Sequence, residues 1–387
     1  MTHQLKDITF NEILEMLANQ GLDSSNAAFS FLLNSAMLLE RQKYLNAQPY
    51  ERTEERQGYA NGFKPKTVKS RLGELNLAVP QVRESGFYPQ CLEKGMRSER
   101  ALRLALAEMY VQGVSTRKVT DIVEKMCGFN ISTSEVSRMT QELDGVLEGW
   151  RSRPLGLFKF VYLDARYEKV RHGGTVIDCA VLVAAGVDAN GKREILGVSV
   201  SLSEAEVHWR AFLQRLQERG LHGIELFISD DHSGLKAARR AVFPSVPWQR
   251  CQFHLQQNAQ KYIPKKDMKE QVAADIRAVF NAPDRAEADR FLNKTITLYE
   301  KSAPALAKWM GENLPEGLTA FSFSAFDQKK IRTVNLLERL NREINRRTRV
   351  ATLFPNEASC LRLVTAVVME VSDEWLTERN TYLPMHK

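Results

Sequence analysis

The stretch Ile224–Asp231 reads IELFISDD, an apolar run that ends in two adjacent aspartates. A short apolar run of this kind is typical of a buried strand, and open α/β sheets gather their ligands at the C-terminal ends of such strands. Because side chains alternate along a strand, Asp230 shares a face with Ile228 while Asp231 points to the other face. The stretch therefore predicts an α/β sheet that presents Asp230 at one edge.

A second carboxylate, Asp164, ends another expected apolar strand, which opens the segment FKFVYLDARYEKVR at 158–171. Alternation predicts that Phe158, Phe160 and Tyr162 share the face of Asp164. Either aspartate alone is compatible with a simple turn former. Two carboxylates at the ends of adjacent strands form a candidate site for magnesium, which prefers oxygen ligands.

A third carboxylate ligand is expected from the amphipathic helix at 333–349, in the segment that begins KIRTVNLLERLNREINRR at residue 330; this helix offers Glu338 and Glu343. At 100° per residue, Glu338 borders the apolar stripe and lies in line with Arg342 and Arg349, whereas Glu343 falls on a different side. Helix geometry therefore favours Glu338, in a basic stripe where metal and phosphate meet. An ordinary Glu–Arg pair four residues apart is the alternative.

The elements beyond Pro154 follow the order three strands, helix, strand, helix, strand. That order is the one of a ribonuclease-H-like core, in which helices cover a mixed sheet. The pair Asn190-Gly191 predicts a tight hairpin between the second and third strands. We expect a catalytic domain at 154–387 with a helical insertion at about 255–323, where no strand pattern occurs.

Residues 1–95 are expected to form a helical lobe followed by a β-hairpin. The first strand of the hairpin carries Lys66, Lys69 and Arg71 at near-alternating positions, which predicts one basic face suited to DNA. A solvated edge strand that resists aggregation would carry the same residues.

Residues 96–153 are expected to form a helix-turn-helix DNA-binding region, with helices at 99–113, 115–128 and 132–150. Ser-Thr pairs suited to capping open the second and third helices, and glycines end the first two. The third helix would present Ser134 and Arg138 near its N-terminal end, the part that a recognition helix turns toward base edges. Three-helix units also occur as scaffolds that bind no nucleic acid.

The composition fits a polyanionic partner, since the 387 residues carry a formal net charge of +7. The longest apolar run, Cys179–Val187, is too short to span a bilayer, and the charged N-terminal stretch is unlike a secretory signal. We therefore expect a cytoplasmic protein with no membrane partner.

The five cysteines are scattered and odd in number, which argues against a disulfide framework. Cys251 and His254, in WQRCQFH, are spaced like half of a zinc site. Structural zinc needs four ligands, and no second such pair follows. We therefore expect a packing and hydrogen-bonding role for Cys251 and His254.

Several long blocks, in the right order, resemble the mutator-type bacterial insertion-sequence transposases, a family of DDE transposases. LDARYEKVR resembles the block around the family's first catalytic Asp, ISDDHSGLKAA the block around the second, and WQRCQFHLQQN its Cys-x-x-His block. TVNLLERLNREINRRTRVATLFPNE resembles the block with the catalytic Glu, while GELNLAVPQVR and MYVQGVSTRKV resemble the stretch that binds element ends.

This resemblance implies a DNA transposase whose catalytic residues Asp164, Asp230 and Glu338 hold two Mg²⁺ or Mn²⁺ ions for strand cleavage and strand transfer. The implied partners are terminal inverted repeats and target DNA, and synapsis of two ends implies a homodimer or larger assembly. The sequence departs from the family at Asp231, where a small residue is usual, and at Gln257, where Arg is usual. The choice between Asp230 and Asp231 stays open on these grounds.

Two other functions remain compatible with the sequence. A non-catalytic DNA-binding regulator would use only the three-helix region, although the three carboxylates argue against it. A ribonuclease-H-like nuclease would cut DNA without joining it, and only a strand-transfer assay separates it from a transposase.

Overall fold

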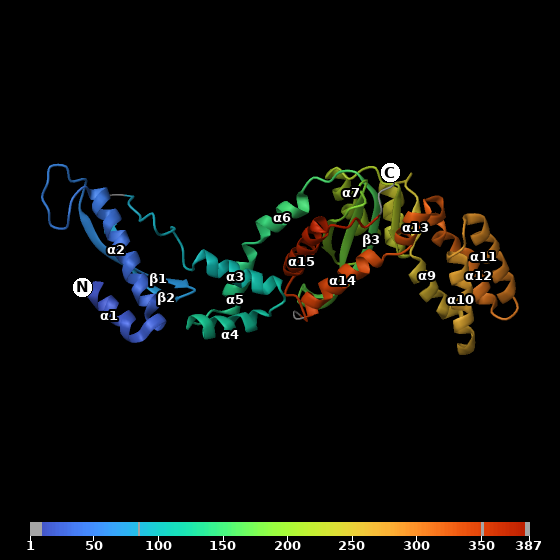
Figure 1. The fold of residues 1–387 in the computed structure, drawn as a ribbon, viewed down its shortest axis with the longest axis horizontal. Coiled ribbons are helices and arrows are strands. Elements are labelled where there is room, and N and C mark those ends of the chain that lie inside the picture. Colours follow the sequence, from blue (N-terminus) through green and yellow to red (C-terminus); the bar gives the residue numbers. More distant parts are fainter. Residues whose placement is uncertain (1–9, 84–85, 350–351, 384–387) are drawn as a thin grey trace. The chain divides into compact units, whose positions relative to one another are not determined.

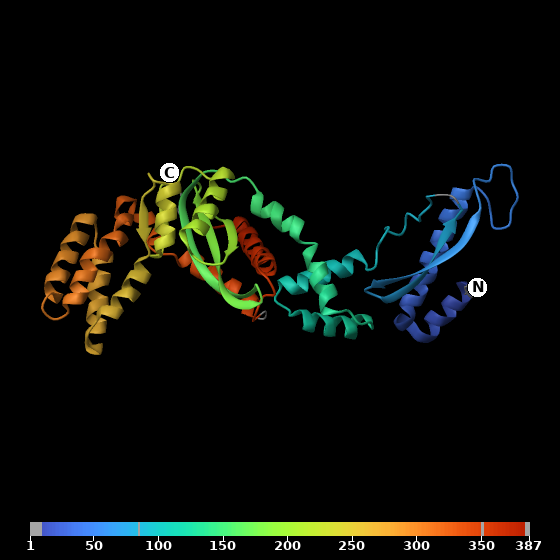
Figure 2. The same cartoon turned by 180° about the vertical axis from the view of Figure 1, so that it is seen from behind.

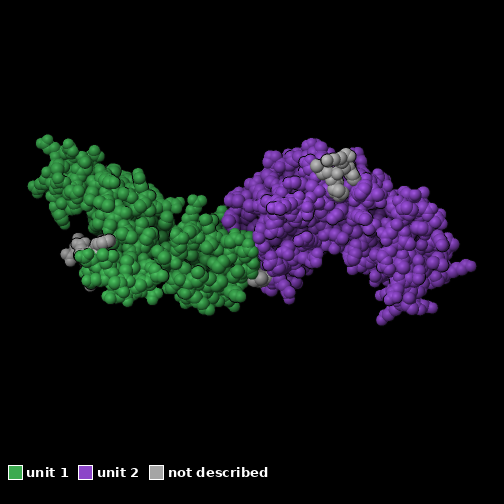
Figure 3. All heavy atoms as spheres, in the orientation of Figure 1, with its two compact units in different colours: residues 1–142 green, residues 143–387 purple. Residues whose placement is uncertain are grey.

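The computed structural model describes residues 10–83, 86–349 and 352–383. The chain divides into two compact units, Met1–Glu142 and Leu143–Lys387, which Figure 3 colours separately. The predicted start of the N-terminal lobe and the predicted end of the catalytic domain lie outside the described residues.

The first unit begins with two helices and a long hairpin. Helices α1 (Phe10–Gln20) and α2 (Ser25–Leu45) flank a 3₁₀ turn, and strands β1 (Ala60–Ser70) and β2 (Gly73–Val82) pair antiparallel. Met37 of α2 packs against Val68 and Leu75 of the hairpin in one apolar cluster. The predicted helical lobe and hairpin are thus both present.

The prediction of one basic face on the hairpin is wrong. Lys66 lies on the face of buried Val68, and Lys69 lies on the opposite face, because residues three apart on a strand point in opposite directions. Lys69 instead forms an ion pair with Glu135 at 3.2 Å. The basic side chains of β1 therefore do not form a single surface.

Three short helices, α3 (Arg100–Val111), α4 (Thr116–Cys127) and α5 (Thr133–Gln141), complete the first unit around a common apolar core. Ser115 caps α4, and Ser132 forms a reciprocal capping box with Glu135 on α5. Gly128 ends α4 in the left-handed conformation at φ 69°. The predicted caps are confirmed.

The third helix, predicted at 132–150, is broken into α5 and α6 (Asp144–Ser152). Helix α6 packs on α15 (Glu357–Thr377) in the second unit, where Arg362 binds both carboxylate oxygens of Asp144 at 2.7 Å. The chain therefore divides at 142/143, earlier than the boundary at residue 153 expected from the sequence.

The second unit contains a five-stranded mixed sheet in the order β5-β4-β3-β6-β7. Its strands are β3 (Phe158–His172), β4 (Thr175–Asp188), β5 (Arg193–Ser201), β6 (Leu226–Ser229) and β7 (Trp248–Arg250). Strands β3, β4 and β5 pair antiparallel, and β6 and β7 run parallel to β3. The predicted element order and the Asn190-Gly191 hairpin are confirmed, with Gly191 at φ 73°.

Helices cover both faces of this sheet, as Figure 1 and the reverse view in Figure 2 show. Helices α7 (Glu206–Glu218) and α8 (Ser233–Val242) pack on one face, where Val161 and Leu163 of β3 share a core with Trp209. Helices α14 (Asn335–Thr348) and α15 pack on the other face. The even-numbered residues of β3 from Phe160 onward face α14 and its surroundings.

A helical segment separates β7 from α14, as predicted. It comprises α9 (Gln252–Ala259), α10 (Lys269–Phe280), α11 (Arg285–Tyr299), α12 (Pro304–Asn313) and α13 (Ala325–Ile331), with short 3₁₀ turns between them. Seventeen of its buried residues form an apolar core of their own. Across the described residues, none of the helices combines the length and apolar character needed to cross a membrane.

Candidate active site

Asp164 and Asp230 lie side by side on adjacent parallel strands. Leu163 of β3 pairs with Ser229 of β6, so the residues that follow them, Asp164 and Asp230, stand next to each other. Strand β3 continues to His172 alongside β4, so the expectation that Asp164 ends its strand is wrong. Asp164 lies instead at the point where β3 continues beyond the end of its parallel neighbour β6. The edge of the sheet next to Asp164 is therefore open to a ligand.

Phe158 does not share the face of Asp164, contrary to the alternation argument. The register of β3 against β4 shifts between Phe158 and Phe160, and such a bulge inverts the facing of every residue on one side of it. Phe158 therefore packs in the core under α7 and α8. Phe160 and Tyr162 keep the predicted face, because they follow the bulge.

Asp164 is held by helix α14. The side-chain amide of Asn341 donates a 2.7 Å hydrogen bond to Asp164 Oδ2. Burial raises the pKa of the Asp164 carboxyl to about 7; hydrogen bonds from the Ala165 backbone and Asn341 lower it, and the charges of Asp230 and Glu204 add to the increase. This carboxyl is poised to ionise when a cation replaces the water that it has lost.

Glu338 lies one helical turn before Asn341, so both side chains leave α14 toward the same side. Its Oε1 atom is buried and has no hydrogen-bond partner. Glu343, the alternative, forms an ion pair with Arg346 at 3.0 Å. The predicted buried stripe is present at Leu337, Leu340 and Ile344, and Arg342 and Arg349 are exposed.

Asp231 points away from Asp230 into an ion-pair network. It contacts Lys236 at 2.7 Å and Arg250 at 3.0 Å, and both of these cations also contact Glu316 of the helical segment. The Arg250 side chain is only 3% exposed. The geometry gives Asp231 a role in joining elements, which leaves Asp230 as the carboxylate beside Asp164.

Cys251 and His254 have separate surroundings. Cys251 is fully buried at the start of α9, burial raises its pKa, and its backbone N–H donates to the Ser229 carbonyl at 2.8 Å. His254 Nδ1 lies 3.9 Å from Asp230 Oδ2 and is buried without a hydrogen-bond partner. Cys251 fits the predicted packing role, while His254 lies beside the carboxylates.

Sequence reasoning missed three residues around Asp164. Asn341 could have been found, because it lies three residues after Glu338 on the same helix. Glu204 acts on Asp164 through its charge and lies 3.7 Å from His232 Nδ1, and the chain between β5 and α7 gives no signal of this. Arg166 donates to the Asn341 carbonyl at 2.5 Å and so fixes α14 to β3.

The donor set suits a hard cation, because its members are carboxylate oxygens. Asp230 Oδ1 and Glu338 Oε1 are both buried without a hydrogen-bond partner, and such orphaned oxygens are costly unless something binds them. Within the described ranges, no three His, Cys, Asp or Glu side chains are grouped closely enough to hold a metal ion. The oxygens are thus of the right kind but are not drawn together in this structure.

Comparison with known proteins decides the family. The chain matches the family described as "Transposase, Mutator family" over residues 1–378. The chain belongs to the Mutator family of transposases.

The curated relatives of this transposase align with it over nearly their whole lengths. It is 56% identical to the transposase for insertion sequence element IS406 of Burkholderia multivorans over 363 residues, covering 93% of this chain and 94% of the relative. Identity is 42% with the ISRM5 transposase of Rhizobium meliloti, covering 92% and 89%. It is 38% with the IS256 transposase in transposon Tn4001 of Staphylococcus aureus, covering 94% of each.

The DNA-binding residues predicted for this transposase differ in whether their side chains already contact other protein groups. Ser134 and Arg138 are exposed on α5. Lys69 also donates to the Asn130 carbonyl at 3.1 Å, and Arg71 pairs with Glu99 at 3.2 Å. Lys69 and Arg71 therefore already have protein partners, whereas Ser134 and Arg138 are accessible on the surface of α5.

Proposed function

We propose that this transposase binds the terminal inverted repeats of its element and catalyses metal-dependent cleavage and strand transfer of DNA. The observation that carries the proposal is the adjacency of Asp164 and Asp230 on parallel strands, with Asn341 of α14 bonded to Asp164 and Glu338 one turn away. Three carboxylates at the open edge of a mixed sheet suit phosphoryl transfer with two metal ions.

The sheet supports a ribonuclease-H-like core. Three antiparallel strands followed by two parallel ones, with helices on both faces, form the arrangement that the element order predicts. Within it, the first and fourth strands are neighbours and bring Asp164 and Asp230 together. The third carboxylate comes from a helix late in the chain, after the helical segment.

Asp164, Asp230 and Glu338 would hold two Mg²⁺ or Mn²⁺ ions, which when bound activate the attacking oxygen and stabilise the leaving one. Asn341 orients Asp164 through its 2.7 Å hydrogen bond, and Arg166 holds Asn341 in turn. The nucleophile would be water for cleavage and the freed 3′-hydroxyl for joining. No covalent intermediate with the protein is needed.

End recognition is assigned to the first unit. Ser134, in the first turn of α5, and Arg138, in its last turn rather than near its start as predicted, are exposed and would contact the DNA, and Lys66, Lys69 and Arg71 of the hairpin would contact phosphates. Arg342 and Arg349 on α14 would contact the DNA near the carboxylates. Because two element ends must be joined together, the active form is proposed to be at least a homodimer.

The test is incubation of the protein with a duplex of its element's own end and a target plasmid, with and without Mg²⁺. The proposal expects metal-dependent nicking and joined products, both lost in Asp164→Asn, which should still bind the duplex. Nicking without joining would indicate a nuclease instead. Duplex binding without nicking would indicate a DNA-binding regulator.

A further inference from the structure

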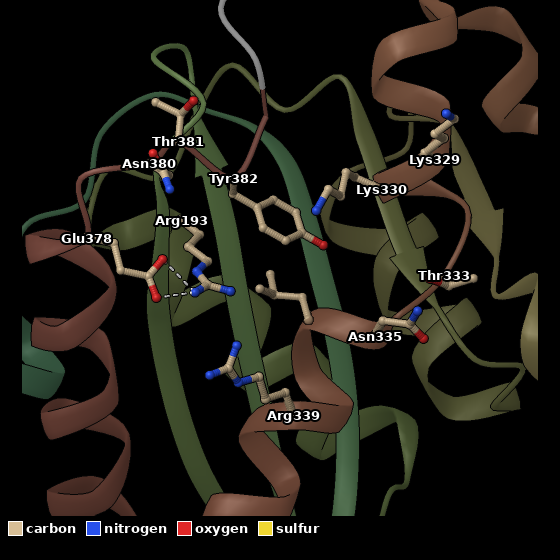
Figure 4. A pocket seen from close by; sticks show the side chains of 11 residues that line it. Arg193, Lys329, Lys330, Thr333, Asn335, Arg339, Glu378, Asn380, Thr381 and Tyr382 are labelled. Atoms are coloured by element: carbon tan, nitrogen blue, oxygen red, sulfur yellow. Dashed lines mark hydrogen bonds and ion pairs between the residues drawn. The ribbon is translucent and has the colours of Figure 1, made fainter.

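A pocket of about 470 Å³ lies beside the candidate active site, where three parts of the second unit meet. Figure 4 shows residues of the α13–α14 region, Arg193 of β5 and the segment after α15 around it. The candidate active site uses none of the lining residues. They are Arg193, Lys329, Lys330, Thr333, Asn335, Leu336, Arg339, Glu378, Asn380, Thr381 and Tyr382.

The lining carries an excess of positive charge. Arg193 is neutralised, because it binds both carboxylate oxygens of Glu378 at 2.6 and 2.7 Å and lies over the Trp375 ring. Lys329, Lys330 and Arg339 are exposed, and none of them forms an ion pair with a residue in the described part of the chain. Three uncompensated cations around one hollow favour an anionic ligand.

The start of α14 adds donors to the same hollow. Val334 occupies the N-cap position, and no side chain caps the helix. Thr333 and Asn335, on either side of Val334, line the pocket. The first turn of a 14-residue helix presents backbone N–H groups and the positive end of its dipole, an arrangement that binds phosphate.

One wall of the pocket is pinned by the turn between β4 and β5. The backbone N–H of Tyr382 donates to the Gly191 carbonyl at 2.8 Å. Lys330 Nζ lies 4.5 Å from the centre of the Tyr382 ring. The Tyr382 ring packs edge-on against the ring of Tyr162 on β3, with the ring centroids 6.5 Å apart. The sheet therefore positions this wall of the pocket and, through the Tyr382 ring, Lys330.

Tyr162 also connects the pocket to the carboxylates. Tyr162 and Asp164 are two residues apart on the same face of β3, a separation of about 6.8 Å along a strand. On the helix side, Arg339 of the pocket directly follows Glu338. A DNA strand at the carboxylates would thus pass within a nucleotide or so of the pocket.

We propose that this pocket binds a backbone phosphate of the DNA strand next to the phosphate that is cut. The inference rests on the proposed function and names a second contact for the same substrate. Lys330, Arg339 and the first turn of α14 would bind the phosphate. This contact would fix the position of the DNA strand relative to Asp164 and Glu338. Glu378 would limit the affinity through its negative charge.

The experiment measures binding of the full chain to a duplex of the element end over a range of salt concentrations. Lys330→Gln and Arg339→Gln should each weaken binding and reduce the slope of log K against log salt by about 0.9, the loss of one phosphate contact. Lys308→Gln is the matched control, because Lys308 is an exposed lysine of the helical segment with only a 3.9 Å contact to Glu312. Glu378→Gln should strengthen binding at low salt, a gain that a damaged fold could not produce.

Slopes for Lys330→Gln and Arg339→Gln equal to that of Lys308→Gln would overturn the pocket proposal, as would weaker binding by Glu378→Gln. A separate arm uses inorganic phosphate at matched ionic strength. If phosphate raises the melting temperature of the wild type but not of Lys330→Gln, and the DNA slopes are unchanged, the pocket serves a free anion and the proposal fails. Wild-type protein that binds with pocket-dependent slopes but never cuts would overturn the proposed function and leave the pocket standing.

Discussion

The side-chain amide of Asn341 donates to Asp164 Oδ2 at 2.7 Å, and the backbone carbonyl of Asn341 accepts from Arg166 at 2.5 Å. One residue of α14 is thus fixed at two points to one face of β3. Thr348, near the end of the same helix, donates to Glu168 at 2.9 Å. These contacts set the angle at which α14 presents Glu338.

Asn341→Ala should slow cleavage about 10- to 100-fold, because a hydrogen bond to a charged group contributes about 1.5 to 3 kcal/mol. As a positioning change, it should also raise the Mg²⁺ concentration needed for half-maximal cleavage. Asn345→Ala, an exposed residue of the same helix, is the control and should match the wild type. An unchanged Mg²⁺ requirement in Asn341→Ala would show that the bond does not serve the metal site.

Asp164 should make stability depend on pH in metal-free buffer. Its folded pKa of about 7 exceeds the ordinary value of 3.8, so between these values the folded chain binds more protons than the unfolded chain. Stability therefore falls as pH rises through this range, by up to about 1.4 kcal/mol per pH unit. Urea unfolding in chelator at several pH values should show this slope, and Asp164→Asn should lack it. Parallel curves for the two proteins would contradict the raised pKa.

The two adjacent aspartates should respond in opposite ways. Asp231→Asn breaks contacts with Lys236 and buried Arg250, so it should lower the free energy of unfolding by about 1 to 3 kcal/mol while cleavage persists. Asp230→Asn should abolish cleavage with little loss of stability, because Asp230 Oδ1 has no hydrogen bond to lose. Thermal melts and nicking assays on both variants check this. A stable but inactive Asp231→Asn would reverse the assignment.

Glu338→Gln should abolish cleavage and joining and leave end binding intact. Glu343→Gln removes an exposed ion pair with Arg346, worth about 0.5 kcal/mol or less, so its cleavage rate should stay within about twofold of the wild type. Gel-shift and strand-transfer assays separate the two effects. If Glu338→Gln stayed active and Glu343→Gln lost activity, the catalytic carboxylate of α14 would be Glu343 and the assignment of Glu338 would be wrong.

Side-chain facing could be predicted from sequence only where the backbone is regular. Alternation placed Asp230 correctly beside Asp164 because β6 has no bulge. It failed for Phe158, because a single-residue shift in β3 leaves no mark in the pattern. The basic face of β1 failed for a simpler reason, since Lys66 and Lys69 are an odd number of residues apart.

Contacts between residues far apart in the chain could not be predicted from sequence patterns. Helical periodicity identified Glu338, but nothing near Glu204 shows that it lies close to Asp164. Residues 132–150 looked like one helix, since the pattern has no proline there. The break at 142/143 follows from tertiary contacts, in which Arg362 binds Asp144 across more than two hundred residues. Such contacts exist only once the fold has formed.

The helical segment between β7 and α14 has its own apolar core, and buried polar groups fasten it to the sheet. Gln249 of β7 donates to the Gly317 carbonyl and accepts from the Ala320 backbone, both at 2.7 Å. Apolar contacts tolerate sliding, whereas hydrogen bonds are directional. Because the helical segment has its own core and is attached to the sheet by hydrogen bonds, its length can change over evolution without disturbing the sheet. Variation among relatives should therefore be concentrated in the outer helices, while the residues corresponding to Gln249 remain fixed.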